Sequence, residues 1–288
     1  MYDFEIFQPR SLIGALELKK KYGADLHPLA GGTDVLVSVK NNRVNWGNKP
    51  RLLDLNNLKS ELHFINESTK TIEIGSLVTH SEIIGNNLID NHVPALKKAL
   101  SLIGSPQIRN RGTLTGNMVH ASPAADSLPI LYARDAQVEI QTLHSIKKIL
   151  ISDFITGPGL VDLDPTGIVT KIIIPKLPDY TGDYLSLRQR RALSCNVVSV
   201  GIELLKYENV IEDIRIGLGA VSPTVVRGKK TEELLKRKLL TEELLGEAEI
   251  LIQTECNPIT DVRSNMDYRR AMIGVLLRRF LQKHLDLK

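Results

Sequence analysis

The sequence predicts an α+β protein built from two domains. Short segments of strand-like composition alternate with short helical segments as far as Pro175, and beyond it three strands are followed by helices. A stretch rich in turn-forming residues, 175–182, separates the two patterns. With 288 residues, the chain is long enough for two domains of ordinary size. We therefore expect a first domain over residues 1–175 and a C-terminal domain over residues 176–288.

Capping residues mark the helices of the first domain. Ser11 is the expected N-cap of a helix that runs to about Tyr22, where Gly23 ends it. Thr79 is expected to cap a second helix over residues 81–84. Further helices are expected at 94–103 and 127–133, and strands at 4–7, 26–30, 51–55, 71–75, 137–141, 149–151 and 167–175.

The C-terminal domain is predicted to be a sheet covered on one face by helices. Three apolar segments that read as strands of a meander lie at 184–189, 196–205 and 211–219. Two helices, broken near Leu240 and Thr241, are expected within 230–253, and a strongly amphipathic helix is expected at 266–285.

The composition excludes several classes of function. The net charge of +4 is mild and its lysines and arginines are scattered, so nucleic-acid binding has little electrostatic support. No apolar run approaches the roughly 20 residues of a membrane span, and the acidic N-terminus lacks a signal-peptide core, so we expect a cytoplasmic protein. Cys195 and Cys256 have no metal-ligand spacing, and the seven histidines are scattered, so no metal site is expected on this chain.

Two glycine-bearing segments are the candidates for ligand binding. In the first, a strand runs into Gly31-Gly32-Thr33-Asp34, where the main chain can turn sharply and present successive N–H groups to an anion. The second, 103–133, combines glycines, prolines and small polar residues with apolar anchors, as in a long loop pinned to a core. A plain tight turn and a plain crossover loop are the alternatives. The motifs of Rossmann and P-loop nucleotide sites are absent.

Five segments of the chain carry a recognisable pattern. They are Ala30 to Leu36, Ser105 to Asn110 running into Thr113 to Asn117, Ala121 to Asp126, Gly157 to Gly159, and Gly219 to Thr224. In this order they resemble the FAD-binding medium subunit of the molybdenum hydroxylases, the family of xanthine dehydrogenase and carbon monoxide dehydrogenase. The resemblance covers essentially the whole chain.

The resemblance implies an FAD-binding fold of the vanillyl-alcohol-oxidase or MurB-like (PCMH) type, with α+β subdomains at about 1–55 and 56–175, followed by a C-terminal domain of a sheet plus helices. FAD, bound non-covalently, would lie between the subdomains. N–H and hydroxyl donors suit its pyrophosphate, and glycine permits a close approach. The implied ligands are Ala30, Gly31, Gly32, Thr33, Asp34, Thr113, Thr115, Gly116 and Asn117 for the pyrophosphate, and Asp126 for the adenosine ribose.

The resemblance also implies a function in electron transfer. In this family a molybdopterin-bearing large subunit oxidises the substrate, and a small subunit with two [2Fe–2S] clusters conducts the electrons. The FAD of this chain would collect them for NAD⁺ or another acceptor, so no catalytic acid or base is expected here. The implied assembly is a dimer of heterotrimers. The substrate, whether purine, aldehyde, N-heterocycle or CO, would bind to another subunit.

Two positions depart from the family's pattern. Thr115 stands where a glycine is usual, and a β-branched residue would be strained there if the position needs a positive φ. Ser186 stands where a lysine often precedes the paired arginines, here Arg190 and Arg191, which removes a candidate contact to the flavin.

Two alternatives therefore stay open. One is a stand-alone flavin oxidoreductase, for which 176–288 is small and poor in clustered ionisable or aromatic residues. The other is a flavin-free scaffold or assembly subunit, which the departures at Thr115 and Ser186 make conceivable.

Overall fold

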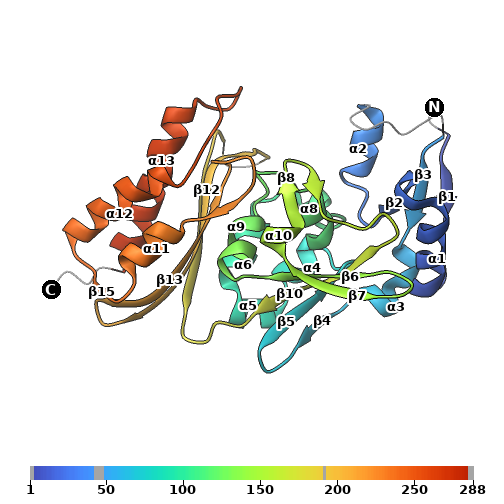
Figure 1. Ribbon diagram of the computed structural model, residues 1–288, viewed down its shortest axis with the longest axis horizontal. Helices are drawn as coiled ribbons and strands as arrows, with labels where there is room; N and C mark the ends of the chain where they lie inside the picture. The colour runs from blue at the N-terminus through green and yellow to red at the C-terminus, as the bar shows by residue number, and fades with distance from the viewer. Residues whose placement is uncertain (1–2, 42–48, 191–192, 285–288) are drawn as a thin grey trace.

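The computed structural model describes residues 3–41, 49–190 and 193–284. Their strands form three sheets of three to five strands and one small ribbon, arranged side by side along the long axis of the molecule (Figure 1). This mixture of helices and sheets confirms the predicted α+β class.

The first sheet is small and parallel, with the strand order β1-β3-β2. Helix α1 begins at an N-cap in which Ser11 Oγ accepts a hydrogen bond from the Gly14 N–H, and it ends at Gly23, whose φ is +55°. Both ends agree with the sequence-based expectation. The elements of this part are β1 (Glu5–Phe7), α1 (Leu12–Tyr22), η1 (Gly23–Asp25), β2 (Leu26–Leu29), α2 (Val35–Lys40), β3 (Arg51–Asp54), η2 (Asn56–Leu58) and α3 (Lys59–Leu62).

The second sheet is antiparallel, with the order β4-β5-β10-β6-β7. Alternate residues such as Ile72, Ile74 and Val138 point into a core shared with the surrounding helices. The elements are β4 (Ile65–Glu67), β5 (Thr71–Gly75), α4 (His80–Ile84), α5 (Asn87–His92), α6 (Pro94–Ser101), α7 (Pro106–Arg109), α8 (Leu114–Val119), α9 (Leu128–Ala133), β6 (Gln137–Gln141), β7 (Ile146–Leu150), α10 (Ile151–Phe154), β8 (Ile155–Gly157), β9 (Leu160–Val161) and β10 (Ile168–Pro175).

The third sheet runs in the order β11-β12-β13-β14, with β15 paired to β13. Figure 1 shows α11, α12 and α13 on its outer side and α9 on its inner side. The elements are β11 (Thr181–Arg188), β12 (Asn196–Tyr207), β13 (Val210–Gly219), β14 (Val226–Arg227), α11 (Lys229–Leu235), β15 (Lys238–Leu239), α12 (Glu242–Thr254) and α13 (Met266–Gln282). The predicted meander and the predicted helices are present, but α9 covers the face expected to be open.

Glycines allow α9 to pack directly on the backbone of the third sheet. A Cβ added at Gly217 would lie 2.0 Å from the Pro129 carbonyl oxygen, and one at Gly201 would lie 2.6 Å from Ile130 Cδ1. Since no side chain fits there, these glycines set how closely the two parts of the chain approach each other.

Several local predictions need correction. The strand expected at 149–151 is β7, which begins at Ile146, while Ile151 starts a helix. The segment 113–117, expected as part of a long loop, is the start of helix α8, because the Thr113 hydroxyl caps it. Short elements such as α7, β8 and β9 were not expected, since two to four residues are too few to show a periodicity.

Candidate functional site

A cavity of about 380 Å³ lies where the first sheet's loops meet the second sheet's helices. This volume is within the usual range of small-molecule sites. Its lining comes from the segments 28–35, 112–120 and 163–169, together with Leu55, Ser76, His80, Ile103 and Ile108. Apolar side chains form much of the wall, and polar groups enter from several segments.

The two glycine-bearing loops cross each other at this cavity. A Cβ added at Gly31 would lie 2.0 Å from the Arg111 carbonyl oxygen and 3.0 Å from the Gly112 Cα, so only glycine permits the crossing. Gly32 follows with a φ of +74°, a conformation that L side chains rarely adopt. Segments about 80 residues apart are thereby joined into the wall of one cavity, which is compatible with the shared site that the family resemblance implies.

Nine of the ten predicted cofactor ligands line this cavity. Thr113 Oγ1 accepts a hydrogen bond of 3.0 Å from the Gly116 N–H, which fixes the start of α8. Thr115 lies inside that helix and does not have a positive φ. The backbone strain that a β-branched residue would suffer at a positive φ therefore does not arise here. The nine are Ala30, Gly31, Gly32, Thr33, Asp34, Thr113, Thr115, Gly116 and Asn117.

Asp126, the tenth, does not line the cavity. It is only 8% exposed, and its Oδ1 accepts hydrogen bonds from Tyr184 Oη at 2.7 Å and Asn196 Nδ2 at 2.8 Å, and also from Arg188. Burial raises the pKa of Asp126, and the Arg188 charge opposes that shift. The strands of the third sheet therefore hold this carboxylate, and its predicted contact with the adenosine ribose stays a prediction.

Ser186 also takes a structural role. Its hydroxyl accepts a hydrogen bond of 3.1 Å from Arg188 Nε, and it does not line the cavity. Arg190 donates to the Leu193 carbonyl oxygen, and Arg191 lies outside the described residues.

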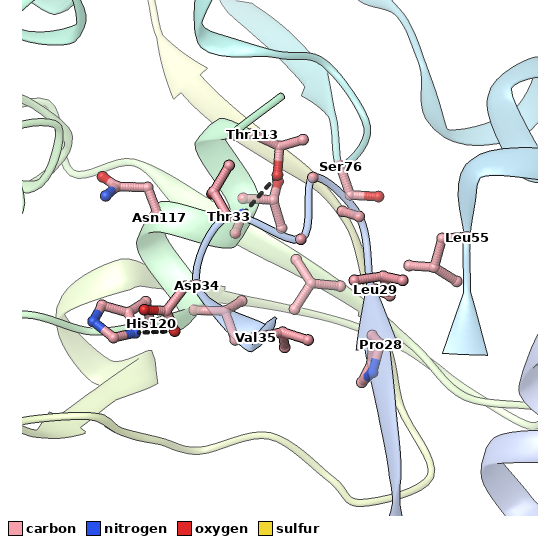
Figure 2. Close-up of a pocket in the computed structure, with 18 of the residues that line it drawn as sticks. Pro28, Leu29, Thr33, Asp34, Val35, Leu55, Ser76, Thr113, Asn117 and His120 are labelled. Carbon is pink, nitrogen blue, oxygen red and sulfur yellow. Dashed lines mark hydrogen bonds and ion pairs between the residues drawn. The ribbon is translucent and has the colours of Figure 1, made fainter. Parts of the chain in front are cut away.

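A contact between a carboxylate and an imidazole joins the two sides of the cavity at its rim. Asp34 Oδ2 at the start of α2 lies 2.9 Å from His120 Nδ1 at the end of α8. Figure 2 shows the two side chains meeting beside the lining residues Val35 and Asn117.

Two polar residues of the wall were not predicted as ligands. Ser76 and His80 are 3% and 2% exposed, and Ser76 Oγ, His80 Nδ1 and Thr115 Oγ1 are buried without a hydrogen-bond partner. Burial and the Arg109 charge lower the pKa of His80 to about 4, so its ring is neutral at neutral pH. The sequence showed only the capping residue Thr79, which places His80 at the helix start but not in a cavity.

These residues fit FAD. Backbone N–H groups of the crossing loops and hydroxyl groups suit a pyrophosphate, and apolar residues such as Leu29, Ile168 and Val169 suit a flat aromatic ring. Unpartnered buried polar atoms in the wall are the groups that such a ligand would satisfy.

No group of three or more metal-ligating side chains occurs in the described residues. Within the same part of the chain, no helix has the length and apolar character needed to cross a membrane.

Comparisons with known proteins agree with this geometry. The family described as the FAD binding domain in molybdopterin dehydrogenase matches residues 2–177, and the CO dehydrogenase flavoprotein C-terminal domain matches residues 184–284. The carbon monoxide dehydrogenase medium chain of Hydrogenophaga pseudoflava is 28% identical over 96% of both chains. The glyceraldehyde dehydrogenase medium chain of Sulfolobus acidocaldarius is 30% identical over 95% of both.

A solved structure of a carbon monoxide dehydrogenase has the same fold. Carbon monoxide dehydrogenase from Hydrogenophaga pseudoflava superimposes with a TM-score of 0.91 at 27% identity, over 98% of this chain and 97% of that one. These matches confirm the resemblance on which the sequence analysis relied. The chain belongs to the family of FAD-binding medium subunits of the molybdenum hydroxylases.

Proposed function

We propose that this chain is the electron-transfer subunit of a molybdenum-dependent dehydrogenase, which takes electrons from a [2Fe–2S] partner subunit and passes them to NAD⁺ or another acceptor. The observation that carries the proposal is the crossing of the loops at Gly31 and Gly112, beside a cavity whose wall holds unpartnered polar groups. Bound FAD supplies a carrier that holds two electrons and exchanges them with one-electron and two-electron partners.

The nine lining residues predicted from the sequence would hold the cofactor. The backbone of 30–34 and the first turn of α8 would bind the pyrophosphate through N–H groups and the hydroxyls of Thr33 and Thr115. The apolar walls would exclude water from the enclosed part of the ligand. The residues of this chain thereby bind and orient the cofactor, and none is needed to move a proton.

The partners follow from the same proposal. The matched relatives are named as medium chains or FAD subunits of dehydrogenases, which supports a complex with a [2Fe–2S] small subunit and a molybdopterin large subunit. A dimer of heterotrimers is the assembly that we expect. We also infer that the domains divide at 175–176 and the subdomains near residue 55, which agrees with the three separate sheets.

Both alternatives have less support. A stand-alone oxidoreductase needs a substrate-binding half, but the third sheet is covered by α9 on one face and by α12 and α13 on the other. A flavin-free scaffold has no need of unpartnered polar atoms in a cavity wall, and Thr115 fits its helix without strain.

The visible spectrum of the purified chain, before and after incubation with FAD, tests the proposal. We expect a yellow protein that retains stoichiometric FAD through gel filtration. A chain that stays colourless would contradict the proposal and favour a scaffold role.

Affinity purification of the tagged chain from its native cells, followed by iron and molybdenum analysis, then tests the partners. NAD⁺ reduction by that complex tests the acceptor. A yellow chain that oxidises an organic substrate alone would favour the stand-alone enzyme.

A further inference from the structure

Some polar side chains of the cavity wall have buried atoms with no hydrogen-bond partner in the described residues. In the described residues, seven buried side-chain atoms lack a hydrogen-bond partner, and three of them, on Ser76, His80 and Thr115, belong to cavity-lining residues. They come from the residue after β5, the start of α4 and the first turn of α8. A buried polar group without a partner is costly, so its presence in a wall indicates a ligand that pairs with it.

His80 lies at the place where the two loops cross. Its backbone N–H donates to the Gly112 carbonyl oxygen at 2.9 Å. A Cβ added at Gly112 would lie 3.2 Å from His80 Cδ2 and 3.4 Å from Thr33 Oγ1, so the imidazole and the Thr33 hydroxyl border the same glycine. The imidazole is therefore beside the segments proposed to hold the pyrophosphate.

Ser76 and Thr115 line the same cavity as His80. The Ser76 N–H donates to the Thr170 carbonyl oxygen at 3.0 Å, which places Ser76 beside the cavity-lining Val169. Thr115 precedes Gly116 in the helix that the Thr113 hydroxyl caps. Hydroxyl groups and a neutral imidazole can donate to phosphate oxygens and accept from ribose hydroxyls, and they add no charge to the site.

We propose that Ser76, His80 and Thr115 hydrogen-bond the phosphate–ribose backbone of FAD. The assignment rests on the proposed function, since it needs FAD in this cavity. It adds Ser76 and His80 to Thr115, whose hydroxyl the proposed function already places at the pyrophosphate. It also assigns a cofactor-binding role to His80, one of the seven histidines of the chain.

Conservative variants of the full-length apoprotein test the assignment. Thr115→Val and Ser76→Ala each remove one hydroxyl and keep the shape of the site. His80→Leu removes the imidazole donor, whereas His80→Asn keeps an amide N–H close to the position of Nδ1. Affinities for FAD and for ADP, which has the diphosphate and a ribose but no flavin ring, are measured by calorimetry, with thermal unfolding as the check on folding.

We expect Thr115→Val, Ser76→Ala and His80→Leu to weaken FAD and ADP binding equally, each by about 3–10-fold. His80→Asn should stay within about threefold of the wild type. Ser199→Ala is the matched control, because Ser199 Oγ is also buried and unpartnered but does not line the cavity, and it should leave both affinities unchanged.

Wild-type affinities in the folded Thr115→Val and Ser76→Ala variants would overturn the assignment. Weaker FAD binding with unchanged ADP binding would also overturn it, because the contacts would then be with the flavin end. A wild-type chain that binds FAD but not ADP counts against it in the same way. If the wild type bound no FAD at all, the proposed function itself would fail, and the two failures are thus distinguishable.

Discussion

The side chains of Asp34 and His120 meet at 2.9 Å across the rim of the cavity, 86 positions apart in the sequence. Asp34 belongs to the first glycine-bearing segment, and His120 lies at the end of α8 within the second (Figure 2). A carboxylate beside a pyrophosphate site is repulsive unless a positive charge or donor offsets it. His120 is placed to offset Asp34, and the pair also links the two halves of the proposed site.

The first prediction follows from this pairing. His120→Ala should weaken FAD binding by about 3–10-fold, because the Asp34 carboxylate then faces the pyrophosphate with less compensation. The double variant Asp34→Asn, His120→Ala should recover most of the loss. Quenching of flavin fluorescence on binding measures both affinities. If the double variant bound FAD as weakly as His120→Ala alone, the pair would be a structural link and not a charge compensator.

Gly116 gives a second prediction. It lines the cavity, and a Cβ there would lie 3.0 Å from Thr113 Oγ1, so Gly116→Leu should reduce FAD binding at least tenfold. The C-terminal domain should stay folded, as monitored by circular dichroism and urea unfolding. Gly85→Leu is the control, since Gly85 does not line the cavity and a Cβ there has no contact closer than 3.6 Å. Unchanged flavin content in Gly116→Leu would place the pyrophosphate elsewhere.

The third prediction concerns pH. The pKa of His80 is lowered to about 4 in the folded chain, against an ordinary value near 6.5, so the unfolded chain takes up this proton first as the pH falls. Stability of the flavin-free chain should therefore decrease between about pH 6.5 and pH 4. The contribution of His80 is about 2 kcal/mol between pH 7 and pH 5. Urea unfolding at both pH values measures it. His80→Asn should show a correspondingly smaller pH dependence, and an identical dependence would contradict a neutral buried imidazole.

The sequence singled out the two glycine-bearing segments because their determinants are local, whereas their meeting at one site followed only from the family resemblance. Gly31 and Gly32 indicate a sharp turn of the backbone. Thr113 is a capping residue whose hydroxyl accepts a hydrogen bond from the N–H three positions later. The long strands and amphipathic helices of the C-terminal part were predictable for the same reason, since their periodicity extends over many residues.

Asp126 and His80 show what a sequence does not reveal. The surroundings of Asp126 are set by Tyr184, Arg188 and Asn196, which lie 58 to 70 positions later in the chain. His80 carries no local motif beyond its place after a capping threonine, so its position in the cavity follows only from how α4 packs on the loop at Gly112. Tertiary contacts decide both cases.

The fourth prediction tests the packing of α9 on the third sheet. Gly217→Ala should destabilise the protein by several kcal/mol, on the order of an overpacked core substitution or more, because its Cβ would lie 2.0 Å from the Pro129 carbonyl oxygen. Gly246→Ala is the matched control, since Gly246 lies inside α12 with no atom within 4 Å of an added Cβ. It should stabilise the chain by about 0.4–1 kcal/mol. Equal unfolding free energies of the two variants would contradict this account of the interface.

The last prediction concerns the buried ion pair between the two parts of the chain. Arg134, at the end of α9, donates from Nε to Glu203 Oε1 at 2.6 Å and from Nη2 to Oε2 at 2.9 Å, and the two side chains are 1% and 0% exposed. Glu203→Leu should destabilise the chain by about 3–5 kcal/mol in urea unfolding, because it leaves a guanidinium buried without its counter-charge. The double variant Arg134→Met, Glu203→Leu should regain most of that loss, since an apolar pair of similar volume needs no desolvation of charge.

An exposed ion pair serves as the control for Arg134 and Glu203. Lys97 and Asp90 are 2.6 Å apart with side chains 35% and 44% exposed, so Lys97→Ala should change the unfolding free energy by less than about 1 kcal/mol. If Glu203→Leu cost no more than Lys97→Ala, the buried pair would not hold the two parts of the chain together. The glycine contacts between α9 and the third sheet, and the hydrogen bonds from that sheet to Asp126, would then hold the interface.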